Sequence, residues 1–307
     1  MVSVAFPTIL SVLLMILLGF ILSRTLLENE AFWSGVSRLC YWILFPVLLF
    51  DIISETSLSG GVVLPIILIL TSALLVIILL SILACYLSGF ERSSASSVIQ
   101  GSFRHNGFIG FAIAPGLLGT IGTELAAICI AILVPITNIA AVIVMIVYNR
   151  QDTNTKISRF LLKEITRNPL IIAVVLGLLF NYFEMALPTF ATLTFELLGD
   201  GALSLLLLCV GAGLVPSFSA ARIAPLFVAI LMKLIIFPAM VVTAGIWAGL
   251  PADIMIILAI FAAMPCAVSA FPLAKQLGGN APLMADIIVL QTVFSLPLSF
   301  LWLFVVS

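Results

Sequence analysis

The chain has 307 residues, of which 64% are hydrophobic and 8% are charged, and its mean hydropathy is +1.38. A soluble domain carries about 25% charged residues, so 12 basic and 13 acidic side chains cannot coat a water-soluble body of this size. The composition excludes a cytosolic enzyme, a secreted disulfide scaffold, a disordered chain and a nucleic-acid-binding protein, and it indicates that the apolar side chains face lipid.

Apolar runs of membrane-crossing length follow one another along the chain. A crossing helix needs about 20 apolar residues, and the runs are too long for barrel strands. We expect an all-α polytopic membrane protein with ten crossing segments: 4–23, 33–53, 62–87, 98–119, 125–148, 168–183, 200–215, 223–250, 254–274 and 281–306. The sixth and seventh are short, so an eight-span version with 168–215 as a re-entrant hairpin stays open. The first segment lacks a preceding basic region, and we expect it to be retained.

Basic residues lie on one side of this predicted topology. The loops after the odd-numbered segments hold Arg24, Arg92, Arg150, Lys156, Arg159, Lys163, Arg167, Arg222 and Lys275. The other loops and both tails hold none. Because cytoplasmic loops attract Lys and Arg, we predict that these loops are cytoplasmic and that both termini lie outside.

A polar, basic linker at 149–167 divides the chain into two parts, 1–148 and 168–307, each with five predicted segments. An odd number of crossings in each part makes the second part run through the membrane in the opposite sense. This is the arrangement of an inverted repeat, which many secondary transporters share.

The fourth and ninth segments are both interrupted by proline and glycine. The fourth contains Gly110 and Pro115, and the ninth contains Pro265 and Pro272. Proline removes a backbone donor, and in hydrocarbon the freed carbonyl is tolerated only where protein or a cavity satisfies it. A lone proline is usually a simple kink, but matched interruptions in two halves indicate a substrate site near the midplane.

The interruptions predict an anion site. We expect the restarting half-helices to begin near 112–115 and 269–272, because their free N–H groups and partial positive charge favour a carboxylate. Ser269 could add a donor or bond its own backbone; Asn138 and Gln291 could satisfy freed backbone groups or link helices. The candidate substrate-binding residues are Asn106, Gly110, Pro115, Asn138, Pro265, Ser269, Pro272 and Gln291.

Four ionisable residues within segments are candidates for gating or charge compensation. Arg104 could guide an anion from the cytoplasmic side or snorkel to the interface. His105, the single histidine, could carry a proton, because imidazole titrates near neutral pH, or could be packed in its neutral form. Lys233 lies near mid-bilayer, where an unpaired ammonium is costly. Asp286 is its candidate partner, or a carboxylate near the inner interface.

The sequence carries no sign of an enzyme. HExxH and GxSxG motifs are absent, and one histidine leaves little room for a histidine-ligated metal. Cys40, Cys85, Cys129, Cys209 and Cys266 lie in apolar stretches without metal-like spacing, which is typical of small buried hydrophobic residues. We predict no catalytic residue, no metal and no cofactor.

Short motifs, taken in order, resemble the auxin efflux carrier family, the bacterial relatives of the plant auxin exporters. They are 168–172 (NPLII), 211–214 (GAGL), 233–238 (KLIIFP), 264–267 (MPCA), 274–279 (AKQLGG), 281–285 (APLMA) and 291–292 (QT). Two positions differ: Gly110-Phe111-Ala112 stands where the family has Gly-Ile-Pro, and Asn280 stands where an acid is common. The first difference implies a fourth-segment crossover that is displaced or gentler than in the relatives. If the acid assists ion coupling or gating in the relatives, that step is lost here.

The resemblance implies ten helices in two inverted five-helix repeats, with the fourth and ninth helices broken and crossing in a mobile domain. The first, second, sixth and seventh would form a scaffold, often dimeric. It also implies a bacterial inner-membrane location and a small organic anion as substrate, such as auxin or malonate.

We therefore expect a secondary carrier that moves a small mono- or dicarboxylate by elevator-like alternating access, with lipid and a second copy as partners. Coupling to H+ or Na+ stays open. The alternatives are a sodium-coupled symporter resembling the bile-acid carriers and, on the broken-helix pattern alone, a channel.

Overall fold

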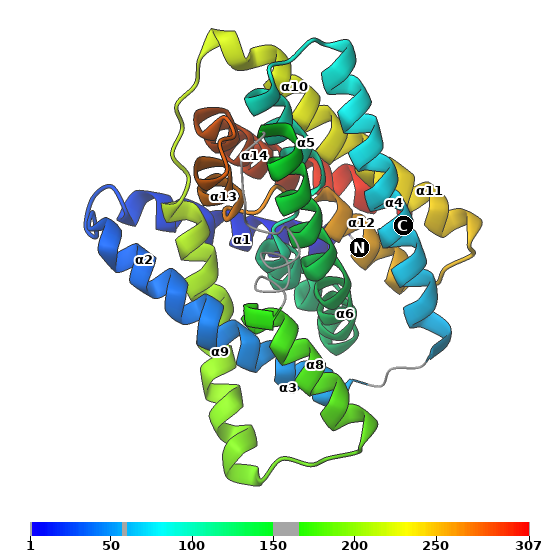
Figure 1. Ribbon diagram of the computed structural model, residues 1–307. Helices are drawn as coiled ribbons and strands as arrows, with labels where there is room; N and C mark the ends of the chain where they lie inside the picture. The colour runs from blue at the N-terminus through cyan, green and yellow to red at the C-terminus, as the bar shows by residue number, and fades with distance from the viewer. Residues whose placement is uncertain (1, 57–59, 150–165, 307) are drawn as a thin grey trace.

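The computed structural model describes residues 2–56, 60–149 and 166–306. Every regular element in these three ranges is helical, which confirms the predicted all-α class for the described part of the chain (Figure 1). Nearly all of the predicted basic linker, 150–165, lies outside the described residues.

Most helices follow the predicted segments, but the fourth segment is divided at residues 104–106 and its second part continues into the fifth. The first half contains α1 (Val2–Leu22), α2 (Glu30–Leu39), α3 (Phe45–Glu55), α4 (Gly60–Leu87), α5 (Arg92–Phe103) and α6 (Gly107–Asn149), with a π-helical turn, η1 (Cys40–Leu44), joining α2 to α3. The second half contains α8 (Pro169–Tyr182), α9 (Thr189–Ala212), η2 (Ala220–Arg222), α10 (Ile223–Leu231), the π-helical turn η3 (Met232–Ile236), α11 (Phe237–Trp247), α12 (Ala252–Ala263), α13 (Ala270–Gln276) and α14 (Ala281–Val306).

Seven helices in the described ranges are long and apolar enough to cross a membrane, and α8 and α12 are shorter apolar helices. The stretch Arg92–Asn149 has 58 residues, which at 1.5 Å per residue would reach about 87 Å, far more than a bilayer core. It is divided after Phe103 and again at Gly119, where φ is 59°. The chain is therefore a multi-pass membrane protein; the inverted relation of its halves stays a prediction.

One predicted segment begins at the wrong residue. The apolar run suggests a helix from residue 200, but α9 begins at Thr189. Glu196 and Asp200 interrupt the apolar run, yet both side chains are exposed on the helix. Charged residues on the outer face of a helix do not stop it, so apolar run length underestimates α9.

Local chemistry explains several helix ends. The Asn168 Oδ1 accepts hydrogen bonds from the N–H groups of Leu170 and Ile171, and Pro169 fills the first helical position, where a missing donor costs nothing. In the second half, Pro238 follows η3 and lacks the N–H that would bond to the Leu234 carbonyl. Trp302 Nε1 donates to that carbonyl instead, at 3.0 Å.

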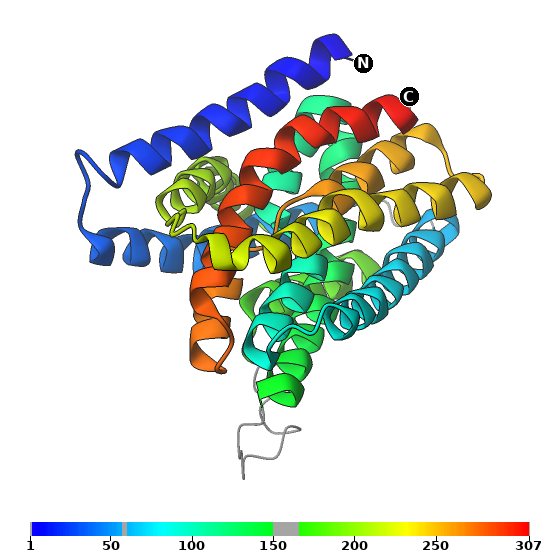
Figure 2. The ribbon, with the colours of Figure 1, turned by 90° about the horizontal axis from the view of Figure 1, so that it is seen from above.

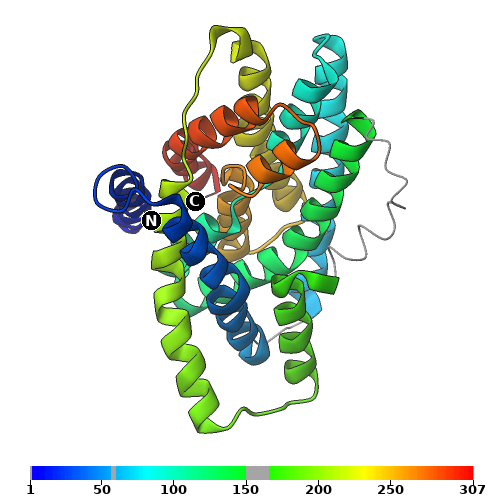
Figure 3. The same cartoon turned by 60° about the vertical axis from the view of Figure 1, so that its left-hand side comes forward.

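The helices form two groups. The first group consists of α1, α2, α3, α8 and α9, and the second of α4, α5, α6 and α10 to α14. In Figure 1, α2 and α9 lie on the left and α3 and α8 at the bottom, and Figure 3 brings the left-hand side forward. The two ends of the described chain lie close together (Figure 2), where the Phe6 and Phe300 rings are 6.1 Å apart.

Within the first group, α1 and α9 touch backbone to backbone. A Cβ at Gly19 would overlap the Leu208 carbonyl, and one at Gly211 would overlap the Ile16 carbonyl. Small residues permit such an approach between membrane helices. The pair is therefore closely packed and suited to a rigid support.

The two groups meet mainly through apolar contacts. The buried Phe45 ring lies edge-on to Phe108 and Phe111 of α6, with centroids 4.8 and 5.5 Å apart. A Cβ at Gly213, which follows α9, would lie 2.9 Å from Val268. These contacts between the two groups are made by apolar side chains.

Candidate functional site

Two non-helical segments meet in the core of the second group. Residues 104–106 separate α5 from α6, and residues 264–269 separate α12 from α13. The Asn106 backbone N–H donates to the Pro265 carbonyl oxygen at 2.6 Å, and both residues are buried. Gly110 packs against Met264 and Phe261, and a Cβ there would lie 3.2 Å from both side chains. The candidates Asn106, Gly110 and Pro265 are thus brought together.

The expected restart at 112–115 is wrong. Arg104 adopts an extended conformation (ψ 147°) and ends α5, and α6 begins at Gly107. The Asn106 Oδ1 accepts from Phe108 and Ile109 at 3.2 and 3.4 Å, so it caps the new helix. The helix continues through Pro115, because a proline in a membrane helix removes only one hydrogen bond.

In the ninth segment, α13 begins at Ala270, within the expected range 269–272. Pro272 is the third residue of this short helix and is exposed. Pro115 is half-buried along α6, two turns beyond the first non-helical segment. Neither proline is at the meeting point of the segments.

Arg104 links the meeting point to two other candidates. One terminal guanidinium nitrogen donates to Asn138 Oδ1 at 3.0 Å and to Ser269 Oγ at 2.9 Å. The other donates at 3.2 Å to Gln100 Oε1. Arg104 is 6% exposed, Asn138 is half-buried and Ser269 is exposed. The guanidinium therefore extends from the buried segment toward an accessible edge.

Gln291 satisfies three backbone groups near the non-helical segments. Its Oε1 accepts from the Cys266 N–H at 2.9 Å, and its Nε2 donates to the Gly101 and Ala229 carbonyls at 3.0 Å each. Gly101 lies in the last turn of α5, whose carbonyls lack helical partners. The amide thus does both things expected of it: it satisfies backbone groups near the breaks, and it links α14 to α5 and α10.

Lys233 is fully buried in η3. Its Nζ donates to the Ala262 carbonyl at 3.0 Å and lies 4.5 Å from the centroid of the Phe237 ring. Ala262 is in the last turn of α12, where the helix dipole is negative. The ammonium therefore stabilises the end of the helix that precedes the second non-helical segment.

Asp286 does not pair with Lys233, so that expected pairing is wrong. Its Oδ2 lies 3.0 Å from an Arg222 terminal nitrogen, and its Oδ1 accepts from the Ser217 N–H and Oγ at 2.9 and 3.2 Å. Asp286 is fully buried. Asp286 therefore attaches the connection that joins α9 and α10 to the helix α14.

That connection, 213–219, is also held at its other end. Arg24, which follows α1, donates to the Leu214 carbonyl, and its guanidinium lies 3.6 Å from the centroid of the Phe20 ring. Leu214 is thus bound to the first helix group and Ser217 to the second.

His105 lies beside Arg104 and is 6% exposed. Within the described ranges, neither ring nitrogen has a hydrogen-bond partner. Its ring centroid lies 6.4 Å from that of Phe261. His105 is thus buried at the meeting point with its hydrogen-bonding capacity unused.

Gln100 is a site residue that the sequence did not predict, and the structure adds a local role for Asn280. Gln100 Nε2 donates to the Ala270 carbonyl at 3.3 Å while its Oε1 accepts from Arg104. Its position four residues before Arg104, on the same helix face, is a signal that could have found it. Asn280 Oδ1 accepts from the Leu283 N–H at 3.0 Å and caps α14. Asp and Asn both cap helices, so Asn280 fills the capping position that an acid would fill; whether an acid there serves coupling stays a prediction.

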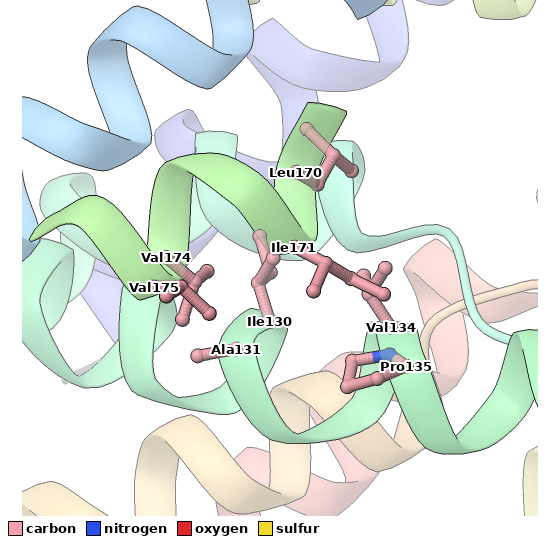
Figure 4. Close-up of a pocket in the computed structure, with 8 residues that line it drawn as sticks. All are labelled: Ile130, Ala131, Val134, Pro135, Leu170, Ile171, Val174 and Val175. Atoms are coloured by element: carbon pink, nitrogen blue, oxygen red, sulfur yellow. The ribbon is translucent and has the colours of Figure 1, made fainter. Parts of the chain in front are cut away.

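A cavity of about 150 Å³ lies between α6 and α8, and its eight lining residues are all apolar (Figure 4). They are Ile130, Ala131, Val134, Pro135, Leu170, Ile171, Val174 and Val175. None is a candidate site residue, and an apolar lining gives a carboxylate no donor.

The comparisons with known proteins agree with this architecture. A family model described as membrane transport protein matches residues 4–303. No curated protein matches the chain.

Proposed function

Because the chain belongs to the membrane transport protein family, the auxin efflux carrier-like family that its motifs resemble, we propose that it is a secondary carrier for a small organic anion. Transport rather than catalysis is the activity of this family. The substrate class and the alternating-access mechanism are our proposal.

The observation that carries it is the Asn106–Pro265 hydrogen bond, at 2.6 Å in the core. We take α5 with the start of α6 as one interrupted crossing, and α12 with α13 as the other. Paired interruptions at corresponding positions of inverted halves are where secondary transporters hold their substrates. Irregular backbone at membrane depth is tolerated when it is buried in protein that supplies hydrogen bonds. Here Gln291 bonds to the Cys266 N–H and Lys233 bonds to the Ala262 carbonyl.

Charge supports an anionic substrate. Arg104 and Lys233 are buried cations beside the two non-helical segments, and Arg104 hydrogen-bonds to the uncharged side chains of Gln100, Asn138 and Ser269. A guanidinium presents paired N–H donors that match a carboxylate. The Ser269 hydroxyl and the Asn138 amide can each turn to donate to the same anion.

The two helix groups support movement. We propose that the first group is the scaffold and the second carries the substrate, with the Phe45 contacts and the Val268–Gly213 contact as the sliding surface. We also propose a bacterial inner-membrane location with both termini outside, as the distribution of basic residues predicts.

Uptake into liposomes tests the proposal. The full-length protein is reconstituted, and entry of labelled acetate, malonate, fumarate and indole-3-acetate is followed. We expect saturable uptake of at least one acid, with acceleration by the same acid inside. Failure of every acid to move and to bind would overturn the carrier. Non-saturable flux without acceleration would indicate a channel, and dependence on Na+ would favour the sodium-coupled alternative.

A further inference from the structure

The single histidine of the chain has an unusual environment. Both ring nitrogens of His105 are buried, and in the described ranges neither has a hydrogen-bond partner. Buried polar side chains are nearly always paired, and an imidazole offers a donor and an acceptor when neutral and two donors when protonated. His105 therefore retains the capacity to bind both an anion and a proton.

Two cations surround this imidazole. Arg104 is the preceding residue, and Lys233 on η3 is also within electrostatic range of the ring. The Cys266 thiol, on the segment after α12, is within range of the same two cations. Two apolar neighbours come from the helices on either side: α12 contributes Phe261, and α6 contributes Ile130, which packs at Gly107 next to the ring.

This arrangement makes protonation of His105 depend on a nearby negative charge. An imidazolium would be a third positive charge beside Arg104 and Lys233 in a buried site, which is unfavourable. An anion bound at Arg104 offsets part of this positive charge and can accept a hydrogen bond from the ring. Because linkage is reciprocal, a proton on His105 must then strengthen binding of the anion by the same factor.

We propose that His105 binds one proton together with the organic anion, so that the carrier is a proton–anion symporter. The proton adds to the free ring nitrogen from water on the loading side and returns to water on the release side, and no other bond changes. This inference rests on the proposed carrier function and adds its coupling ion.

One histidine makes a direct test practical. The full-length protein is prepared with ring-15N histidine and a tag without histidine, so that NMR reports His105 alone. Spectra are recorded with and without acetate, malonate or fumarate between about pH 6.5 and 8, where carboxylates stay ionised. We expect a neutral ring without the acid and a growing imidazolium fraction with it as the pH falls.

Binding measured over the same range gives the second readout. One linked proton raises anion affinity by up to about tenfold for each unit of pH decrease. In His105→Asn the affinity, whatever its level, should no longer change with pH, and Lys275→Gln, an exposed site at the end of α13, should keep the wild-type slope.

The outcomes separate the two proposals. Anion binding with an unchanged His105 spectrum, or a wild-type pH slope in His105→Asn, overturns the symport and leaves the carrier standing. No binding of any acid at any pH overturns both. The spectrum of the unmodified protein decides the matter even if His105→Asn does not fold.

Discussion

Asn106 and Pro265 lie far apart in the sequence, yet the backbone N–H of one donates to the carbonyl of the other at 2.6 Å. Each belongs to a segment that interrupts a helix. Gln291 on α14 accepts from Cys266 in the second segment and donates to Gly101 in the last turn of α5, and Lys233 on η3 donates to Ala262 in the last turn of α12. The two segments therefore form one connected unit, and substitutions in it should affect binding and stability in distinguishable ways.

Arg104→Ala should weaken binding of the transported anion by about 10- to 100-fold, because a hydrogen bond to a charged group contributes about 1.5–3 kcal/mol. Arg104→Lys should recover only part of the loss, since an ammonium cannot bind a carboxylate through two parallel bonds. Isothermal titration with the transported acid measures both. Arg92→Ala, exposed at the start of the same helix, is the matched control. Equal affinities for Arg104→Ala and Arg92→Ala would exclude Arg104 from the site.

Replacing Lys233 separates charge from volume. Lys233→Met and Lys233→Ala both remove the ammonium beside the Ala262 carbonyl, and we expect both to weaken anion binding about tenfold or more. Lys233→Ala also leaves a cavity in a fully buried site and should be less stable than Lys233→Met by about 2–4 kcal/mol. Thermal unfolding and titration report the two effects. Wild-type affinity in Lys233→Met would show that the ammonium serves α12 alone.

Gln291→Leu should destabilise the protein strongly. The substitution leaves the Cys266 N–H and the Gly101 and Ala229 carbonyls without their side-chain partner, and each buried unpaired group costs about 1–3 kcal/mol. The neighbouring Thr292→Val is the control, because that hydroxyl bonds to Ile288 within its own helix. We expect a much larger fall in melting temperature for Gln291→Leu than for Thr292→Val; similar values would contradict the role assigned to the amide.

Gly211→Ala should destabilise the contact between α1 and α9 by about 1–3 kcal/mol, because the added methyl group overlaps the Ile16 carbonyl. Gly201→Ala lies on the same helix, where nothing stands within 4 Å of the new Cβ. That substitution should be neutral or stabilise the helix by about 0.5–1 kcal/mol. Because both substitutions lie on α9, comparing their melting temperatures tests the close approach of α1 and α9 at Gly211.

Asp286→Asn should lower stability by about 2 kcal/mol through loss of the Arg222 ion pair, while the Ser217 N–H keeps an acceptor. A double-mutant cycle with Arg222→Gln should give a coupling energy of about 1–2 kcal/mol. Additive effects of the two substitutions would mean that the Arg222–Asp286 ion pair contributes nothing to stability, and would contradict Arg222 as the partner of the buried carboxylate.

The sequence predicts the helices well because the length of an apolar run is a local property. It misplaces the break in the fourth segment because the rule that proline ends helices points to Pro115, whereas α6 continues through it. The local sequence signal for the true helix start is Asn106, a residue type that caps helices, directly before Gly107, the first residue of α6.

Partners across the fold are harder to predict. Gln291 bonds to groups on three other parts of the chain, and no spacing in the sequence brings them together. Depth along the helices suggests that Lys233 and Asp286 pair with each other. Packing instead places Arg222 beside the Asp286 carboxylate and the end of α12 beside the Lys233 amine.

The 213–219 connection limits how far the two helix groups can separate. Arg24 holds it at Leu214 and Asp286 holds it at Ser217, and an extended chain covers about 3.3–3.6 Å per residue. The chain between Leu214 and Ser217 can therefore span at most about 10–11 Å. A larger separation of the points to which Leu214 and Ser217 are bound would require one of these contacts to break. A movement of that size would therefore begin with loss of the Ser217–Asp286 or the Leu214–Arg24 hydrogen bond.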